Sequence, residues 1–419
     1  MNNITPNNTT SLQSWLCYIE NLHDKTIELG LDRIYNIAKY LNILKPANFI
    51  FTVTGTNGKG TTCHTLETLL ISANYRVGLY SSPHLLKYTE RIRIQGKELN
   101  EKMHTESFSI IESARSRTPL TYFEFSTLSA LFLFKQAHLD IVILEVGLGG
   151  RLDATNIIDS DIAIITNIGI DHTDLLGTTR ASIGYEKAGI FRYGRPAIIG
   201  ESDIPYTIEK AARKKNVLLL QYKHQWSFKK NPYYWCFYDL NGQLDYLPLI
   251  KIPLINAATA LAALRVSGLK LDIQLIYSCL PTITLPGRFQ IIQKQKAPVI
   301  ILDVAHNPHA SEYLATRISN YLSKYTRLFA IVGMLKDKNI SGTLAPLLSK
   351  VDKWYCITLD VPRGADVNQL ISYLPQGSEK CSSIEEAWSK VNQKAKLQDI
   401  ILCFGSFHTV AKILKLLNR

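Results

Sequence analysis

Short apolar runs and helix-like segments alternate along most of the chain. Residues 48–53, 140–146 and 161–166 are mostly apolar or β-branched, which is typical of strands buried on both faces of a parallel sheet. The first run is followed by leucines at helical spacing, beginning at Leu66. This alternation predicts an α/β fold built on a doubly wound parallel sheet.

Other patterns in the first half predict further elements. Residues 11–47 should form two helices around a turn at 29–33, and residues 121–136 should form another helix. Residues 76–80 should form a short strand, and the alternation within 91–97 predicts an exposed strand. The first half is therefore expected to contain strands and helices throughout.

Residues 218–252 interrupt this rhythm. They are rich in aromatic side chains and contain Asn241-Gly242, a pair favoured in β-hairpin turns. We interpret them as a small antiparallel sheet packed by aromatic pairs. A stacking platform for single-stranded nucleic acid is the less favoured alternative.

The alternating pattern begins again after Pro286-Gly287. We therefore expect a first domain over 1–285 and a smaller, Rossmann-like α/β domain over 286–419. In the second domain strands are predicted at 299–304, 328–332, 354–358 and 400–404, and helices near 309–323, 384–397 and 407–417.

Composition places the chain among globular proteins. Its 419 residues are 46% hydrophobic and 20% charged, a length that fits two domains. No apolar run is long enough to span a bilayer, and the first residues, MNNITP, lack a signal-peptide pattern. The seven cysteines are scattered and include no C-x-x-C pair, so the sequence predicts neither a zinc site nor a disulfide framework. We expect a cytoplasmic protein without a membrane partner.

The chain is basic, with a net charge of +12 and a pI near 9.2. Such a charge can serve nucleic acid or small polyanions. The basic residues are dispersed, with short runs only at 213–215 and 229–230. The charge therefore favours anionic small molecules, and no nucleic-acid partner is expected.

The glycine-rich segment GTNGKGTT, residues 55–62, follows the first strand and precedes a helix. Backbone N–H groups of such a loop, the helix N-terminus and one lysine together bind phosphate groups, and Lys59 would reach the β- and γ-phosphates. Only two residues separate Gly55 from Gly58, so the spacing differs from the common P-loop. An ordinary turn would have no use for the lysine and the hydroxyls, so we predict nucleotide binding.

Three of the predicted strands end in, or run into, a group that can bind a metal ion: Ser82, Glu145 and His172. Singly, such residues are more often paired surface groups. Because neighbouring parallel strands bring their carboxyl ends to one edge of the sheet, all three could meet beside the glycine loop. Magnesium needs few protein ligands, although histidine is an unusual one for a hard cation.

Eight ordered motifs together resemble the folylpolyglutamate synthase family of the Mur ligase superfamily. They are GTNGKGTT (55–62), SSPHL (81–85), LEVGLGGRLDATN (144–156), DHTDLLG (171–177), EKAGIF (186–191), LPGRFQ (285–290), DVAHNPHA (303–310) and GSFHTV (405–410). The resemblance runs from about residue 12 to the C-terminus. It looks closest to the bacterial members that are both dihydrofolate synthase and folylpolyglutamate synthase.

The resemblance implies a role for each matching position. Lys187 matches a lysine that is carbamylated in the superfamily, a change that turns a cation into a carboxylate-like ligand. Lys59, His172 and Lys187 would be catalytic. The implied nucleotide contacts are Gly55, Thr56, Asn57, Gly58, Lys59, Gly60, Thr61, Asn256, Arg288 and Asp303; the magnesium ligands are Ser82, Glu145, His172 and Lys187; and the substrate contacts are Phe123, Asp153, Asn156, His306 and Ser406.

The implied activity is the ATP-dependent addition of L-glutamate to dihydropteroate and to reduced folates through an acyl phosphate. This activity requires ATP and two magnesium ions, and a monovalent cation is a further candidate cofactor. Three alternatives remain: folylpolyglutamate synthase activity alone, a peptidoglycan Mur ligase, and a P-loop ATPase linked to nucleic acid. We expect a monomer, because neither domain shows a sustained heptad pattern.

Two positions depart from the family pattern. Tyr185 precedes the EKAGIF motif, where many relatives carry arginine. Residues 252–255, which lead to Asn256, lack the polar residues that some relatives have there. The second departure concerns contacts with the nucleotide base, and neither affects a metal or phosphate position.

Overall fold

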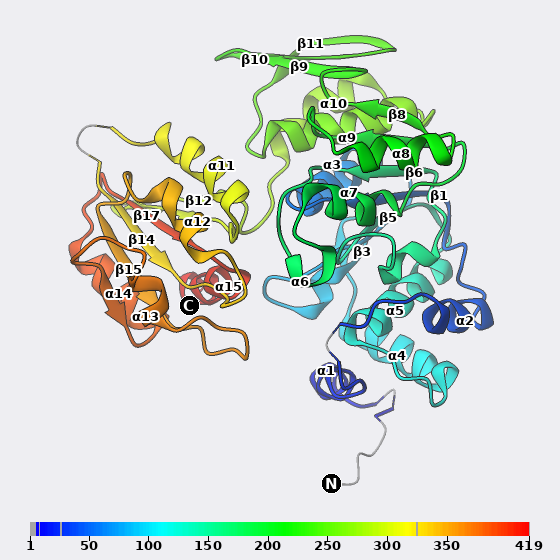
Figure 1. Ribbon diagram of the computed structural model, residues 1–419, viewed down its shortest axis with the longest axis horizontal. Helices are drawn as coiled ribbons and strands as arrows, with labels where there is room; N and C mark the ends of the chain where they lie inside the picture. Colours follow the sequence, from blue (N-terminus) through cyan, green and yellow to red (C-terminus); the bar gives the residue numbers. More distant parts are fainter. Residues whose placement is uncertain (1–5, 8, 26, 324–325, 419) are drawn as a thin grey trace. The chain divides into compact units, whose positions relative to one another are not determined.

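The computed structural model describes residues 6–7, 9–25, 27–323 and 326–418 (Figure 1). The chain divides into two units, Met1–Ile283 and Thr284–Arg419. The boundary expected from the sequence, between residues 285 and 286, lies close to this division. Residues 1–5, which belong to the segment searched for a signal-peptide pattern, lie outside the described residues.

The first unit is built on an eight-stranded sheet of order β4-β3-β2-β5-β1-β6-β7-β8. Strands β2, β5, β1, β6, β7 and β8 are parallel, whereas β3 and β4 form an antiparallel edge. The predicted doubly wound sheet is confirmed. Its strands are β1 (Ala47–Thr54), β2 (Val77–Tyr80), β3 (Ile92–Ile94), β4 (Lys97–Glu98), β5 (Leu139–Glu145), β6 (Ile162–Ile165), β7 (Pro196–Ile199) and β8 (Leu218–Gln221).

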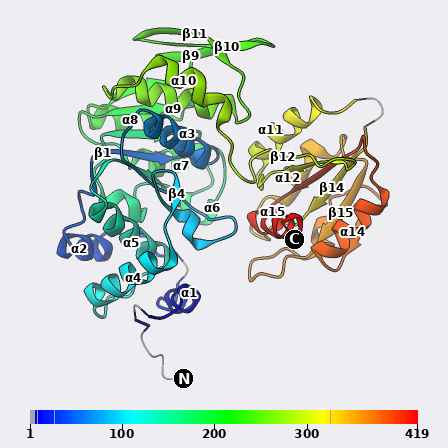
Figure 2. The ribbon, with the colours of Figure 1, turned by 180° about the vertical axis from the view of Figure 1, so that it is seen from behind.

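Helices cover both faces of this sheet, because successive strand residues point to opposite sides. Phe51 and Val53 pack with α3 and α9 on one face, whereas Ile50 and Val142 pack with α1, α2, α4 and α5 on the other. Ile165 packs with α7 and α8. The two layers can be followed in Figures 1 and 2. The helices are α1 (Leu12–Glu20), α2 (Asp32–Tyr40), α3 (Lys59–Ser72), α4 (Glu101–Arg115), α5 (Tyr122–Gln136), α6 (Thr173–Leu176), α7 (Arg180–Ala188), α8 (Tyr206–Lys214), α9 (Leu254–Val266) and α10 (Ile273–Cys279).

A three-stranded antiparallel sheet of order β11-β10-β9 follows in the chain. It consists of β9 (Trp226–Lys230), β10 (Tyr234–Asp239) and β11 (Gly242–Pro248). The hairpin turn between the last two strands is Leu240-Asn241, because Gly242 already pairs with Asp239, so the predicted Asn241-Gly242 turn is wrong by one residue. Trp226, Trp235 and Phe237 are buried in the cluster that contains α9. The packing interpretation of these aromatic residues is therefore confirmed.

The second unit contains a six-stranded sheet of order β12-β13-β17-β14-β15-β16, parallel except for β12. This arrangement confirms the expected smaller α/β domain. The strands are β12 (Gln290–Ile292), β13 (Val299–Leu302), β14 (Leu328–Val332), β15 (Lys353–Ile357), β16 (Glu379–Cys381) and β17 (Ile400–Phe404). The helices are α11 (Pro308–Ser319), α12 (Ile340–Leu344), α13 (Val367–Ile371), α14 (Ile384–Lys394) and α15 (Phe407–Leu417).

Two expectations about strands are wrong in part. Residues 218–221 form β8 of the main parallel sheet and not part of the small antiparallel one, because they pair with β7. The segment 91–97 is not exposed at its start: Arg91 ends the 3₁₀ helix η1 (Tyr88–Arg91), and both Arg91 and Ile92 are buried where β3 pairs with β2.

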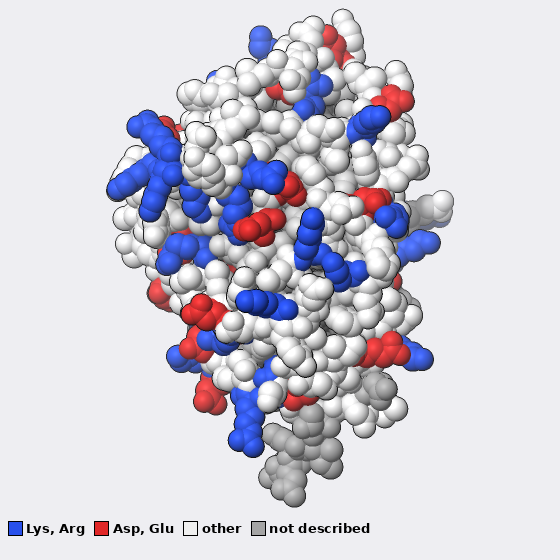
Figure 3. Space-filling model, turned by 90° about the vertical axis from the view of Figure 1, so that its right-hand side faces the viewer, with Lys and Arg blue, Asp and Glu red and all other residues white. Residues whose placement is uncertain are grey.

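One face of the surface can be seen in Figure 3. It carries both basic and acidic side chains, with several basic ones gathered at the upper left, and uncharged residues cover most of the area. None of the helices in the described residues combines the length and apolar character needed to cross a membrane.

Candidate active site

Four neighbouring strands carry the predicted site residues at their carboxyl ends. In the strand order β2-β5-β1-β6, four features lie side by side. They are the segment from β2 to Ser82, Glu145 at the end of β5, the glycine loop after β1, and the segment from β6 towards His172. Val53 pairs with Glu145 across β1 and β5, so the carboxylate lies next to the start of the loop. The chain order reverses at β1, which is where doubly wound sheets bind ligands.

The glycine loop has a backbone that only glycine suits. Gly55 has φ +152°, and an added Cβ would lie 1.8 Å from the Oγ1 atom of Thr166. Gly58 has φ +84°, and its Cβ would lie 2.5 Å from the Oδ1 atom of Asn256. The chain therefore passes closely over β6 and α9, with no side chain in the way of an incoming ligand.

The loop is also prepared to bind an anion. Helix α3 begins at Lys59 without a side-chain cap, so its positive end lies at the loop. The Lys59 ammonium donates hydrogen bonds to the carbonyls of Gly55 (2.9 Å) and Thr56 (3.4 Å). Asn167, directly after β6, accepts a hydrogen bond from the Asn57 N–H (2.9 Å) and thereby fixes the loop.

The Glu145 carboxylate is buried at the end of β5 and accepts a hydrogen bond from the Ser82 N–H (3.2 Å). These two predicted magnesium ligands are therefore in contact. His172 is exposed, has φ 51° and precedes the short helix α6. Its backbone N–H donates to the Asp171 carboxylate (2.9 Å), and the connection from β6 brings this pair to the same edge of the sheet.

Lys187 is 3% exposed, in the last turn of α7. Burial lowers the pKa of its ammonium to about 7, with a further lowering by the charge of Lys59 and an opposing effect of Asp171. The lysine therefore lies within electrostatic reach of both the glycine loop and the loop that carries His172. A neutral amine at this position is a competent nucleophile for carbon dioxide.

The predicted donor set is mostly oxygen, as a hard divalent cation prefers. Within the described residues, no group of three or more His, Cys, Asp or Glu side chains could hold a metal ion. The predicted set contains only two such residues, Glu145 and His172, and adds the Ser82 hydroxyl and a carbamate on Lys187. Such an oxygen-rich set leaves coordination positions for water and phosphate, as magnesium requires.

The predicted substrate residues of the first unit border the same strand ends. The ring of Phe123 lies 5.8 Å from the ring of Tyr80, the last residue of β2. Asp153 accepts hydrogen bonds from the N–H groups of Leu148 (2.9 Å) and Thr155 (3.0 Å), and its burial raises its pKa. This carboxylate therefore shapes the loop after β5.

Asn156 also braces that loop. Its amide donates to the carbonyl of Arg151 (2.9 Å), and its Oδ1 atom accepts from the Arg192 guanidinium (3.0 Å). Asn256 lies on α9, buried against Gly58, so the structure brings it to the glycine loop.

Two of the predicted residues of the second unit lie beside Phe407. The Arg288 guanidinium lies 4.8 Å from the Phe407 ring, and the His306 ring lies 6.4 Å from it. Asp303 follows β13 and accepts from the N–H groups of Phe289 and Ala305, both at 2.8 Å. Burial raises the pKa of Asp303, and Arg288 opposes that shift.

Ser406 follows β17, the neighbour of β13, and caps α15 by accepting from the Thr409 N–H (3.0 Å). The four residues of the second unit thus lie at the carboxyl end of its parallel sheet.

Comparisons with known proteins identify this arrangement. Residues 53–231 match the Mur ligase middle domain, and residues 287–407 match the Mur ligase, glutamate ligase domain. The dihydrofolate synthase/folylpolyglutamate synthase of Escherichia coli is 55% identical over 414 residues, which cover 99% of this chain and 97% of that protein. The chain belongs to the dihydrofolate synthase/folylpolyglutamate synthase family.

Solved structures of this family agree with the fold. The structure of E. coli FolC in complex with DHPP and ADP is 54% identical, has a TM-score of 0.96 and covers 99% of each chain. A bifunctional folylpolyglutamate synthase/dihydrofolate synthase with Mn, AMPPNP and L-glutamate bound is 53% identical, with a TM-score of 0.94, and covers 99% of this chain and 100% of that one.

The two departures from the family pattern have plain structural settings. Tyr185 is exposed, and the Arg151 guanidinium lies 5.4 Å from its ring. In the segment before Asn256, Ile252 is buried in the core and Pro253 caps α9, so these residues support the helix.

Sequence reasoning about the family missed Asn167 and Thr166, which fix the glycine loop. The Thr166 hydroxyl donates to the carbonyl of Asn57 (2.5 Å), and the Asn167 amide donates to the same carbonyl (3.1 Å). The signal was present, because both polar residues directly follow a buried apolar strand.

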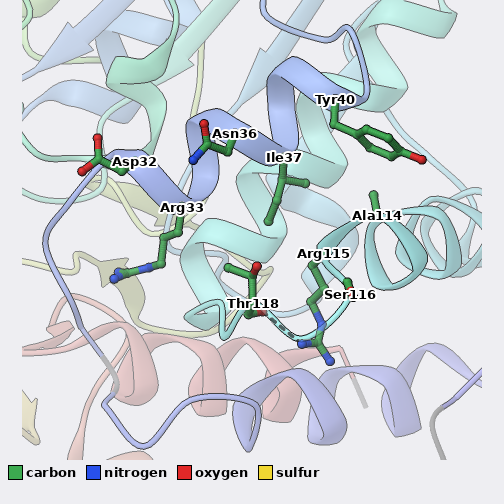
Figure 4. Close-up of a pocket in the computed structure, with 9 residues that line it drawn as sticks. All are labelled: Asp32, Arg33, Asn36, Ile37, Tyr40, Ala114, Arg115, Ser116 and Thr118. Carbon is green, nitrogen blue, oxygen red and sulfur yellow. Dashed lines mark hydrogen bonds between the residues drawn. The ribbon is translucent and has the colours of Figure 1, made fainter.

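A separate pocket of about 520 Å³ lies between α2 and the end of α4 (Figure 4). Its two arginines are already bound within the protein, Arg33 to Glu124 (2.9 Å) and Arg115 to Glu112 (2.6 Å). No predicted site residue of the family lines it. The strand ends, and not this pocket, form the candidate active site.

Proposed function

We propose that this chain is an ATP-dependent ligase that adds L-glutamate to dihydropteroate and to the γ-carboxylate of reduced folates. The observation that carries the proposal is the meeting of the glycine loop, Ser82 and Glu145 at adjacent strand ends. Relatives that are more than 50% identical to this chain carry names that support the same activity.

The chemistry follows from the difficulty of joining a carboxylate to an amine. A carboxylate has no good leaving group. Attack of its oxygen on the γ-phosphorus of ATP breaks the bond to ADP and forms an acyl phosphate. The amine of glutamate then attacks the acyl carbon, phosphate leaves, and the amine proton passes to solvent or a nearby base, which completes the amide.

Residues of the first unit would stabilise the phosphoryl transfer. The Lys59 ammonium, which donates to a loop carbonyl in this structure, would turn to the β- and γ-phosphates of bound ATP. The N-terminus of α3 would add positive potential. Ser82, Glu145, His172 and carbamylated Lys187 would hold two magnesium ions, which neutralise charge on the transferred group when bound. A monovalent cation is a further candidate cofactor of the proposed reaction.

Each unit has an assigned part in the proposal. The first, 1–285, would bind ATP and the pterin–benzoate portion, with Phe123, Asp153 and Asn156 at the substrate. The second, 286–419, would act as the glutamate ligase domain and would contribute Arg288 and Asp303 to nucleotide binding. His306 and Ser406 would complete the substrate-binding set. We further propose a cytoplasmic monomer.

The test is release of ADP in the presence of ATP, Mg²⁺ and L-glutamate, with dihydropteroate or tetrahydrofolate as the carboxylate substrate. Turnover with both is expected. Turnover with tetrahydrofolate alone would leave folylpolyglutamate synthase activity, and turnover only with a peptidoglycan precursor would favour a Mur ligase of the cell wall. ATP hydrolysis without glutamate, together with salt-dependent binding of oligonucleotides, would refute the proposal.

A matched pair of variants tests the role of the loop. Lys59→Met should abolish turnover, whereas Lys39→Met, which removes the same charge from an exposed position in α2, should leave it unchanged. Equal activity of the two variants would contradict the assignment of Lys59.

A further inference from the structure

Arg91 is a buried positive charge to which none of the roles above applies. It is 8% exposed, and it ends η1 directly before the edge strand β3. Its carbonyl accepts a hydrogen bond from the Ser81 N–H (2.9 Å). Arg91 therefore lies beside the carboxyl end of β2, next to the segment that carries Ser82.

The surroundings of Arg91 hold its side chain in place without neutralising it. Its Nε–H donates to the Nδ1 atom of His84 (2.8 Å). The guanidinium lies 5.3 Å from the centre of the Tyr122 ring and 5.9 Å from that of Tyr88. Among the described residues, no carboxylate pairs with Arg91 and its two terminal nitrogens have no hydrogen-bond acceptor.

Other arginines in this unit differ from Arg91 in this respect. Arg93, on β3, pairs with the buried Glu67 (3.0 Å), and the equally buried Arg115 pairs with Glu112 (2.6 Å). Burial of a charge is costly unless a counter-charge or several hydrogen bonds replace the lost water. Aromatic faces offset only part of that cost. A fixed guanidinium with unused terminal nitrogens is suited to bind a carboxylate from a ligand.

The position of Arg91 selects among the anions of the proposed reaction. The phosphates of ATP would bind at the glycine loop after β1, and β5 separates β1 from β2. Tyr80, by contrast, is the last residue of β2, and its ring lies 5.8 Å from that of Phe123 in α5, at the expected folate site. The ligand of Arg91 is therefore expected on the folate substrate.

Dihydropteroate carries only the carboxylate that reacts, whereas a reduced folate also carries the α-carboxylate of its glutamate. An arginine bound to the reacting oxygen would make it a weaker nucleophile, but it can hold a non-reacting carboxylate throughout the reaction. Building on the proposed function, we propose that Arg91 binds the α-carboxylate of the glutamate already attached to a folate substrate. Arg91 then supports polyglutamate formation and not dihydrofolate formation.

The test compares Arg91→Met and Arg91→Lys with the wild-type protein on three carboxylate substrates. These are dihydropteroate, tetrahydrofolate, and the tetrahydrofolate analogue in which 4-aminobutyrate replaces glutamate and so removes only the α-carboxylate. Arg91→Met should raise the KM for tetrahydrofolate roughly 10- to 100-fold, the range for a lost charge-assisted hydrogen bond, and change the KM for dihydropteroate less than about threefold. Arg91→Lys should lie between the two proteins.

The analogue provides the second arm of the test. The wild-type KM for the analogue should exceed that for tetrahydrofolate by about the same factor, and Arg91→Met should no longer distinguish the two. Arg76→Met is the matched control: it removes a charge at the opposite end of β2, from a partly exposed pair with Asp140, and should not separate the two activities.

Each outcome has a clear meaning. Equal loss of both activities in Arg91→Met, or equal wild-type KM values for tetrahydrofolate and its analogue, would overturn the role of Arg91. The second comparison needs no variant, so equal KM values would overturn the proposal even if Arg91→Met does not fold. A wild-type protein inactive on both natural substrates would instead refute the proposed function.

Discussion

Lys187 gives the most quantitative test of the proposed active site. Burial, and then the charge of Lys59, lower the pKa of its ammonium to about 7, against 10.5 for an unperturbed lysine. At pH 7.5 roughly three quarters of such a group is neutral, compared with roughly 0.1% at the ordinary pKa. Several hundred times more of this side chain is therefore available as an amine nucleophile.

A neutral amine attacks carbon dioxide and forms a carbamate with release of one proton. The product is an anion close to Lys59, so a repulsion becomes an attraction and the modified state is stabilised. We expect the wild-type protein, incubated at pH 8 with ¹³C-labelled bicarbonate, to show one slowly exchanging carbamate signal in its ¹³C NMR spectrum. Lowering the pH well below 7 should remove the signal, because the lysine is then protonated.

Two variants make the assay decisive. Lys187→Met should lose the signal and at least about 100-fold in ligase kcat, the scale for removing an electrostatic contact to a transition state. Lys215→Met should retain both. Lys215 also has a lowered pKa caused by burial, but it donates to the Phe191 carbonyl (2.6 Å), away from the predicted site residues. A signal that survives in Lys187→Met, or its absence from the wild-type protein at pH 8, would refute the reasoning.

Three further predictions concern the loop, the carboxylate and the core. Gly55→Ala should lower the free energy of unfolding by about 2 to 4 kcal/mol and abolish ATP binding, since its Cβ would lie 1.8 Å from Thr166 Oγ1. Thermal unfolding and nucleotide titration measure both effects. Gly194→Ala is the control for backbone strain alone, because Gly194 also has a positive φ (+66°) but its added Cβ meets nothing within 4 Å; it should cost less stability and keep ATP binding. Glu145→Gln should keep the fold but lower kcat by about 100-fold or more, as kinetics at saturating Mg²⁺ and circular dichroism can verify. The His104 side chain is fully buried, its two ring nitrogens have no hydrogen-bond partner among the described residues, and burial lowers its pKa to about 4. Because the unfolded chain takes up the proton near pH 6.5 and the folded one only near pH 4, stability should fall by up to about 3 kcal/mol as the pH falls through that window. Urea unfolding at pH 7.5 and 5 should show this loss in the wild-type protein and a smaller one in His104→Leu; an unchanged difference would exclude His104 as its source.

The sequence predicted the buried parallel strands well for a physical reason. A strand covered on both faces has no polar side, so its apolar run ends abruptly, as at residues 328–332 and 400–404, where prediction and structure agree. Short edge elements lack this signal. Strands β12 and β16 and helices α12 and α13 were therefore missed, and residues 218–221 were assigned to the wrong sheet. The buried parallel strand β7 was also missed, because it has only four residues and begins with a proline.

The site was predictable in its parts but not in its environment. The rule that strand ends meet at one edge brought Ser82, Glu145 and the glycine loop together correctly. The burial of Lys187 and Arg91 could not be read from local pattern, because each depends on segments distant in the chain. For Lys187 the family resemblance indicated a special role. For Arg91 only the structure shows that a charge expected at an exposed position is buried without a carboxylate.

The most direct test of the proposed ligase is to follow oxygen atoms. Dihydropteroate labelled with ¹⁸O in its carboxylate is converted with ATP, Mg²⁺ and L-glutamate, and the phosphate and pterin products are analysed by mass spectrometry. Formation of dihydrofolate with one ¹⁸O atom transferred to inorganic phosphate for each ADP is the predicted result, because the carboxylate oxygen leaves with the phosphoryl group. Phosphate without ¹⁸O, or ADP formed without dihydrofolate, would contradict the proposed reaction.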